Sequence, residues 1–496
     1  MKKKNNKNTK SKSIKKVENN SEINKSKYAK YLLFLPFFVP IALFIGKFAI
    51  DNDFWFTINQ GKYVIENGLP DTVINVIHEG LAFLYQSSGT GILFYLVYNY
   101  LGNIGIMFMT LIMLELIAYF YYKLCLLVSK NNYRSIILTT LFMLIFLLYT
   151  FPRPHLFTVF NLVLILYLLE KYIKENNYKY LIPVPFIYLL QVYMHGIYYV
   201  PLLIFITPYL LNSFKYKFEF LNQGPVNYNK KPLFIMYLAS ILIGFLNPYT
   251  YKVFTYGFSS YGQTVMKQNI NELGSINFNT FFGKICIITI IVTFLIYIFN
   301  RKKKIPLRYY LLLLGTTVLA LDAYKSFYLF MACSFFPIAY IYREEIEQKI
   351  SKKAKIVTAI IILVISCITI FTTKVLRPPQ QDSAEFLVEY NKIEKPRVYT
   401  SFEDGSYYEY KGFDCYIDPR AELFLKSNNK KFDIIVENFD MQHGVIAVKD
   451  FLDKYNFDYL VVKVDSDAIY TYLQENPDND FNKIYDKDKY QIWEKK

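Results

Sequence analysis

Long apolar stretches alternate with short polar ones along most of this chain. Runs of about 18 or more apolar residues recur, and that is the length with which a helix crosses the hydrocarbon core of a membrane. The pattern therefore predicts a polytopic α-helical membrane protein with about 11 transmembrane helices. We expect these helices, with ends loose by several residues, at 31–50, 104–128, 135–151, 155–170, 179–194, 197–212, 233–246, 284–300, 307–321, 326–342 and 355–373.

The pattern changes near residue 377, where the long apolar runs end. We predict a soluble α/β domain over 377–496, a membrane domain over 31–376 and a basic arm over 1–30. The arm is rich in Lys and Asn and too polar to bury a core, so we expect it to be disordered. Within the last domain, strands are expected at 396–402, 414–418, 458–464 and 481–494, and helices at 383–393, 445–456 and 467–476.

Residues 81–102 are apolar enough to suggest one more span. Gly89 and Gly91 interrupt the run, and counting it as a span would place the basic segment 301–304 on the outer face. We therefore interpret 81–102 as an interfacial or re-entrant helix, which membranes tolerate where protein buries it. It belongs to a predicted outer loop over 51–103.

Basic residues set the expected orientation. The chain has 56 Lys and Arg against 40 Asp and Glu, a net charge of +16, and the excess lies in the N-terminal arm and in the loops of one face. Basic loops stay in the cytosol, so we expect a multi-pass protein of the cytoplasmic membrane with a cytosolic N-terminus and an extracytoplasmic C-terminal domain. That domain is acidic, so the basic charge indicates contact with anionic lipid and no nucleic-acid partner.

Polar residues that suit chemistry fall on the opposite, outer face. Each has a simpler interpretation: Asp51 and Asp53 as a solvated helix end, Arg153 as an anchor in a proline turn, Asn247 as a helix stop before Pro. Their coincidence on one face favours a site, because ionisable groups at span edges are costly and mark substrate pathways. No Cys and His pattern indicates zinc. The residues are Asp51, Asp53, Asp71, His78, Glu79, Arg153, His155, His195, Asn247, Glu272, Asp322 and Lys325.

In this order the sequence resembles the GT-C superfamily of membrane glycosyltransferases, of the bacterial protein O-mannosyltransferase and aminoarabinose-transferase type. Members have one span, an outer loop that opens with an Asp, two interfacial helices, many further spans and often a soluble outer domain. The resemblance in architecture covers nearly the whole chain. The segments that carry it are "DNDFWFTINQGKYVIENGLPD", "FPRPHLF", "QVYMHG", "LNPY" and "YIDPRAELF".

The resemblance implies a reaction. The enzyme would transfer a sugar from a polyprenyl-phosphate donor to a lipid, glycan or protein acceptor on the outer face, with inversion at the anomeric carbon. Asp53 would be the general base, with Asp51 as the alternative, and Arg153 would bind the departing phosphate together with His155 or Lys325.

Further roles follow from the same resemblance. Trp55 would stack on a sugar or hold the lipid, and Glu272 would stand in for a second acidic motif. His195 and Asn247, in two of the matching segments, are expected at the substrate. No cofactor follows from the residues, and a divalent metal stays open.

Two other functions stay open at this point. A transporter or flippase of polyprenyl-linked glycans would use the same outer cations without a base, and broken spans at matching positions in two halves would favour it. A non-catalytic scaffold for cell-envelope assembly would use the C-terminal domain as its working part. The three differ in whether Asp53 and Arg153 converge in one cavity, which a scaffold does not need.

Overall fold

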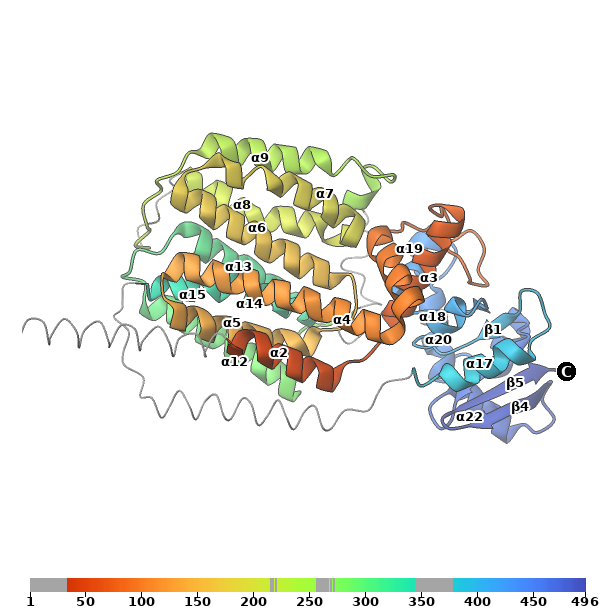
Figure 1. Ribbon diagram of the computed structural model, residues 1–496. Coiled ribbons are helices and arrows are strands. Elements are labelled where there is room, and N and C mark those ends of the chain that lie inside the picture. The colour runs from red at the N-terminus through yellow and green to blue at the C-terminus, as the bar shows by residue number, and fades with distance from the viewer. Residues whose placement is uncertain are drawn as a thin grey trace, which may run out of the picture.

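A computed structural model of the chain describes residues 34–214, 218, 221–255, 267, 270, 273–343 and 378–496. A bundle of long helices forms one end of the molecule, and a smaller part with a β-sheet, formed by the C-terminal residues, lies at the other end (Figure 1). The predicted basic arm and the predicted span at 355–373 lie outside the described residues.

The bundle is built from the predicted apolar runs. Five described segments are long and apolar enough to cross a membrane: Ser88–Ser129, Asn132–Tyr149, His155–Glu175, Tyr178–Ser213 and Phe281–Phe299. This confirms a helical membrane protein, while the number of about 11 spans stays a prediction. The helices are α2 (Phe34–Lys47), α4 (Ser88–Ser129), α5 (Asn132–Phe146), α6 (His155–Glu175), α7 (Pro183–His195), α8 (Tyr199–Ser213), α9 (Lys230–Ile243), α12 (Phe281–Phe299), α13 (Leu307–Asp322), α14 (Phe327–Ser334) and α15 (Phe336–Ile341).

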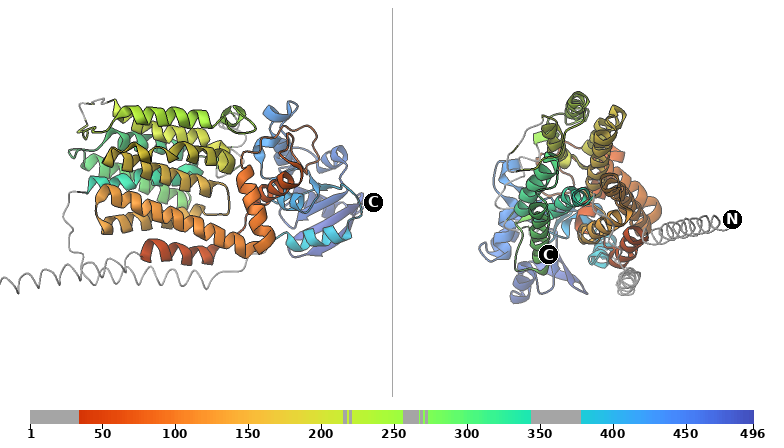
Figure 2. Two further views of the ribbon diagram at one scale, coloured as in Figure 1. Left: turned by 45° about the horizontal axis from the view of Figure 1, so that its top comes forward. Right: turned by 90° about the vertical axis from the view of Figure 1, so that its left-hand side faces the viewer.

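Helix α4 is bent at Gly102, whose φ of 59° and ψ of −154° are not helical. Such a φ suits glycine, which has no Cβ. The part before Gly102 turns away from the bundle and lies beside α3 (Asn52–Asn67), as Figure 2 shows. There Gly61 of α3 meets Gly91, and a Cβ on Gly61 would come within 2.0 Å of the Gly91 carbonyl oxygen. The segment 81–102 thus contains a helix distinct in direction from the span that follows it.

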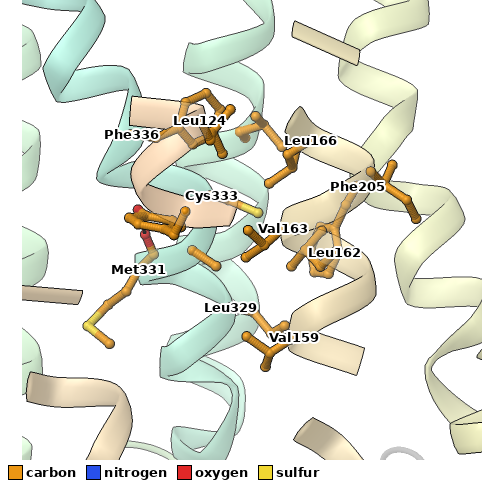
Figure 3. Packing of buried hydrophobic residues seen from close by; sticks show 14 of the residues in the cluster. Leu124, Val159, Leu162, Val163, Leu166, Phe205, Leu329, Met331, Cys333 and Phe336 are labelled. Carbon is orange, nitrogen blue, oxygen red and sulfur yellow. Dashed lines mark hydrogen bonds between the residues drawn. The ribbon is translucent and has the colours of Figure 1, made fainter. Parts of the chain in front are cut away.

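The centre of the bundle is packed with aliphatic and aromatic side chains. Figure 3 shows residues of α4, α6, α8 and the α14–α15 pair meeting there. The predicted single span at 326–342 consists of two short helices. Phe335 separates α14 from α15 and directly precedes Phe336 and Pro337. The labelled residues are Leu124, Val159, Leu162, Val163, Leu166, Phe205, Leu329, Met331, Cys333 and Phe336.

One ion pair is buried in the bundle. Arg308 of α13 donates from Nε and Nη2 to the two carboxylate oxygens of Glu170 on α6, each at 2.9 Å, and both side chains are at most 5% exposed. The hydroxyl of Tyr209 on α8 donates to the same carboxylate at 3.0 Å. The pair therefore joins three helices.

Removing one partner leaves the other charge buried and unpaired. We expect Glu170→Ala to lower the free energy of unfolding by about 3–5 kcal/mol, measured as a fall in the melting temperature of the detergent-solubilised protein. The double variant Glu170→Leu with Arg308→Met should recover most of the loss, because neither charge remains. Glu175→Ala, in an exposed pair with Lys171, should change little; an equal loss there would contradict this explanation.

The polar connections at the end of the bundle far from the sheet lie together (Figure 1). Asn229 donates its backbone N–H to Asn176 Oδ1 at 3.3 Å, and Asn222 Nδ2 donates to the carbonyl of Lys302 at 2.5 Å. These contacts join the connections α6–α7, α8–α9 and α12–α13, which are the basic loops predicted to face the cytosol. The grouping fits the predicted orientation.

The orientation makes a testable prediction. A reporter that is active only outside the cytosol should give a signal when it is fused after Lys496, because the sheet lies at the end opposite the basic loops. A cytosol-only reporter inserted near Lys302 is the matched control and should be active. Cytosolic activity after Lys496 would contradict the orientation and place the candidate site on the wrong face.

The C-terminal residues form a five-stranded sheet of order β2-β1-β3-β5-β4. The first three strands are parallel, and β5 runs antiparallel to β3 and β4. The predicted strands are confirmed in position, and α18 and α20 are helices that the pattern did not predict. The strands are β1 (Arg397–Tyr399), β2 (Asp414–Cys415), β3 (Tyr459–Lys463), β4 (Phe481–Lys487) and β5 (Tyr490–Lys495), and the helices α17 (Gln381–Tyr390), α18 (Gly405–Tyr410), α19 (Lys426–Asn429), α20 (Ile434–Gln442), α21 (Val448–Tyr455) and α22 (Ala468–Glu475).

The sheet region is docked on the loop 51–103. Trp55 of α3 packs on the rings of Tyr407 and Tyr410, with centroids 4.7 and 5.4 Å away. His78 Nε2 lies 2.8 Å from the Tyr416 carbonyl, and burial lowers the pKa of His78 to about 4, so the neutral ring donates this bond at neutral pH. The loop and the C-terminal residues thus share a core, and the boundaries predicted between them stay a prediction.

Candidate active site

A cavity of about 860 Å³ lies where the bundle, α3 and the C-terminal residues meet. Its wall holds most of the ionisable residues that the sequence placed on the outer face. Those residues come from four separate parts of the chain, at 51–53, 153–155, 195 and 322–325, each at the end of a helix or in a connection. The lining residues with ionisable side chains or imidazole rings are Asp51, Asp53, Arg153, His155, His195, Lys267, Asp322, Lys325, Glu403, Arg420 and Glu422.

Asp51 caps helix α3. Its Oδ1 accepts the backbone N–H of Phe54 at 3.2 Å, and its Oδ2 accepts from Nε of Arg153. A side-chain cap of this kind satisfies one of the free N–H groups at a helix start. Asp51 therefore has a structural task, and the solvated-helix-end interpretation is incomplete, because the carboxylate is 16% exposed and ion-paired.

Asp53 shares the same guanidinium. Its Oδ2 lies 2.7 Å from Nη1 of Arg153, and the two side chains are 27% and 24% exposed. Arg153 therefore bridges both carboxylates with two of its nitrogens. The planar fork of Arg makes this possible, since it directs several N–H groups along fixed directions. The convergence of Asp53 and Arg153 in one cavity is the feature that separates an enzyme or transporter from a scaffold.

Lys325 lies in the cavity wall near the two imidazoles. Among the described residues no carboxylate pairs with it, because the neighbouring Asp322 instead accepts from Lys267 Nζ at 2.5 Å. The Nε2 atom of His155 is buried without a hydrogen-bond partner in the described part of the chain. Lys325 therefore leaves a cation available to an anionic ligand.

His195 is held by a buried hydrogen-bond chain behind the cavity wall. Its Nδ1 lies 2.8 Å from the hydroxyl of Thr158, and Gln191 donates from Nε2 to that hydroxyl at 3.0 Å and to the His195 carbonyl at 2.7 Å. Asn161 then donates to Gln191 Oε1 at 2.8 Å. These bonds fix the ring at the end of α7, so His195 is more than a residue of a turn.

Three predicted site residues lie elsewhere or outside the description. Trp55 is 1% exposed and packs on Tyr407 and Tyr410, away from the cavity wall. The reason is the register of α3, in which positions 53, 56 and 60 share a face and 55 points to another. Asn247 builds a turn, with its Nδ2 donating to the Gly244 carbonyl at 2.5 Å. Glu272 lies outside the described residues.

The C-terminal residues supply one wall of the cavity. Arg420, in the segment "YIDPR", donates to Asp418 from Nη2 and Nε at 2.6 and 2.9 Å and to Glu409 Oε2 at 2.9 Å. All three side chains are at most 3% exposed. The buried carboxylates raise the pKa of Arg420, although its burial opposes them, so the guanidinium stays charged. This cluster fixes Arg420 in the cavity wall.

The rest of the cavity is apolar and extends between helices of the bundle. Its wall there comes from α8 and α13, with aromatic rings from η1 (Leu147–Tyr149) and α14. A polar end beside an apolar end suits an amphipathic ligand, whose tail stays among apolar side chains. The lining residues of this part include Leu148, Val200, Ile204, Phe205, Leu311, Leu312, Leu319 and Tyr328.

Within the described residues no group of three or more His, Cys, Asp or Glu side chains is placed to hold a metal ion. Asp51 and Asp53 are two carboxylates, and a guanidinium lies where a cation between them would be expected. The described part of the chain therefore gives no support for a bound divalent metal.

No protein-family model and no curated protein matches the chain. Among solved structures, the archaeal oligosaccharyltransferase AglB from Archaeoglobus fulgidus, in complex with an inhibitory peptide and a dolichol-phosphate, matches with a TM-score of 0.55 and 10% identity over 88% of this chain and 70% of AglB. The same enzyme tethered to an acceptor peptide matches with a TM-score of 0.55 and 11% identity over 88% of this chain and 69% of AglB. The arabinofuranosyltransferase AftD from Mycobacteria matches with a TM-score of 0.50 and 10% identity over 94% of this chain and 40% of AftD.

The chain is similar in fold to AglB and AftD, which are GT-C glycosyltransferases. This confirms the expected fold class and the membrane location in their general form. At 10–11% identity the likeness concerns the fold alone, and the narrower resemblance to O-mannosyltransferases and aminoarabinose transferases stays a prediction. The chain spans less than half the length of AftD.

Proposed function

We propose that this protein is a glycosyltransferase that takes a sugar from a polyprenyl-phosphate donor and transfers it to an acceptor hydroxyl at the outer face of the cytoplasmic membrane. The observation that carries the proposal is the meeting of Asp53, Arg153 and Lys325 in one cavity whose other end is apolar. The GT-C fold, and neighbours whose structures hold a dolichol-phosphate and a peptide, support a lipid-linked donor in general.

The apolar end suits the donor lipid. A polyprenyl chain enters between α8 and α13 from the bilayer, where its contact with apolar walls costs no desolvation of polar groups. The phosphate then lies at the polar end, toward Lys325, His155 and His195. Lys325 is the described cation in this wall that no carboxylate neutralises, so it is the phosphate contact we assign first.

Asp53 is the general base. Its carboxylate accepts the proton of the acceptor hydroxyl while that oxygen attacks the anomeric carbon. The bond between the anomeric carbon and the phosphate oxygen breaks, its electron pair stays on the phosphate, and polyprenyl phosphate leaves. Attack from the side opposite the leaving group inverts the anomeric carbon.

Arg153 has a different role from the one that the sequence suggested. Two of its nitrogens contact Asp51 and Asp53, so it positions the base and offsets the charge of the two carboxylates. Asp51, which caps α3 and binds the same guanidinium, completes the arrangement. The choice between the two acids therefore favours Asp53 as the base.

The test uses the purified protein in proteoliposomes with polyprenyl-phosphate sugars and an extract of envelope glycans as acceptor. We expect release of free polyprenyl phosphate that depends on both the protein and the extract. Movement of an intact donor across the bilayer without release would favour the transporter alternative. Neither release nor movement, with every available donor sugar, would contradict both.

A further inference from the structure

The cavity contains a second polar group that the reaction above does not use. Gln60 lies on α3 two turns after Asp53, and residues three and seven apart share a helix face. Its side chain is 2% exposed and lines the cavity. Its Nε2 has no hydrogen-bond partner among the described residues. A buried amide without a hydrogen-bond partner costs about 1–3 kcal/mol. A ligand that accepts a hydrogen bond from this amide would therefore gain binding free energy.

Arg420 presents the same feature from the C-terminal side. Its Nη1 is buried and has no partner in the described part of the chain, although Nε and Nη2 bind Asp418 and Glu409. Arg420 also lines the cavity and is 3% exposed. Two buried N–H donors in the wall of one cavity indicate a ligand that supplies oxygen acceptors.

The charges around Arg420 indicate that this ligand is neutral. Asp418 and Glu409 are both fully buried against the single guanidinium, so no positive charge remains for a phosphate or a carboxylate. Burial, with Asp418 nearby, raises the pKa of Glu409, which adds no positive charge either. A hydroxyl-rich ligand fits the two donors better than an anion does.

Aromatic rings surround the same donors. The guanidinium of Arg420 lies 5.7 Å from the ring centroid of Phe56 and 5.5 Å from that of Phe83, and both residues line the cavity. Phe402 lines it from the C-terminal side. Apolar ring faces beside hydrogen-bond donors suit a pyranose or furanose ring, which has C–H faces and hydroxyl edges.

We propose that Gln60, Arg420, Phe56, Phe83 and Phe402 form an acceptor subsite for a neutral sugar, so that the acceptor is a glycan. The proposal rests on the proposed function, because it takes Asp53 on the same face of α3 as the base. The acceptor hydroxyl would lie near Asp53 while Gln60 and Arg420 hold the other oxygens of the same sugar. Lys325 and the apolar end remain for the donor.

The experiment measures binding of the full-length protein in detergent, without donor, to immobilised oligosaccharides and peptides. The oligosaccharide arms are neutral and uronic-acid-containing sets. We expect retention on neutral glycans. Gln60→Leu should weaken it about three- to tenfold, the worth of one lost hydrogen bond, and Phe402→Ala should weaken it comparably. Gln60→Leu should not lower the melting temperature, because it removes a buried amide whose Nε2 has no partner among the described residues.

Asn59→Leu is the matched control, since Asn59 is a buried amide on the same helix that bonds Asn75 and does not line the cavity. It should leave glycan retention unchanged. Retention on acidic glycans or peptides alone, or on no arm, would overturn the proposal. Equal retention by Gln60→Leu and wild type would also overturn it and leave a buried water as the partner of the amide. Donor release, measured separately, shows whether the transferase function stands when this binding fails.

Discussion

Asp53→Asn lowers turnover by about two to four powers of ten, which is the usual worth of a positioned general base. Asn keeps the shape of the side chain and still accepts from Arg153 through its oxygen, but it cannot take the acceptor proton. Folding and donor binding should stay close to wild type. Turnover is followed as release of polyprenyl phosphate in proteoliposomes under saturating donor.

Asp51→Asn is the control for this prediction. Asn also caps helices well, and Asp51 is expected to position the site without accepting the proton, so its loss of turnover should be smaller. A larger loss in Asp51→Asn than in Asp53→Asn would exchange the two roles. Wild-type turnover in both single variants and in the double variant would show that the carboxylates serve only the end of α3.

Arg153→Lys should lower turnover by about a hundredfold, a loss expected when a catalytic group is displaced by about 1 Å. Lys carries the charge but has one nitrogen, so it cannot bridge Asp51 and Asp53 as the guanidinium does. The donor concentration for half-maximal rate should change less than the turnover, because Lys325 is assigned to the phosphate.

Arg343→Lys, at the other end of the bundle where Arg343 Nη1 contacts the Tyr340 carbonyl, controls for the chemical change itself and should keep full turnover. Full turnover in Arg153→Lys, at normal abundance, would return Arg153 to the role of an anchor in a proline turn. A large rise in the donor requirement with unchanged turnover would instead restore the phosphate role that the sequence suggested.

The helices and the face that holds the site were predictable because length and periodicity act locally. Asp53, Arg153, His195 and Lys325 each stand at the end of an apolar run that is predicted to face outward, so the alternation of spans brings them to one end of the bundle. Their meeting in one cavity follows from that topology. The sequence placed the interruption at Gly89 and Gly91, whereas both lie in the first turn of α4 and the bend comes at Gly102.

The rest depends on contacts between distant segments. Glu170 and Arg308 are 138 positions apart, and the sequence around either residue does not predict which residue it pairs with. Trp55 was named because Trp suits sugars in general, whereas only the packing of α3 on Tyr407 decides which ring faces the cavity. Arg420 stood in a noted segment, but its place in the cavity requires the docking of the sheet on the first loop.

The most direct test of the central claim is mass spectrometry of the cell-surface glycans of a deletion strain. The strain is complemented with wild type, with Asp53→Asn or with an empty vector, and abundance of each protein is matched. The account predicts that the deletion removes one sugar mass from a defined glycan, that wild type restores it and that Asp53→Asn does not. An unchanged glycan profile in the deletion strain, or full restoration by Asp53→Asn, would contradict the account.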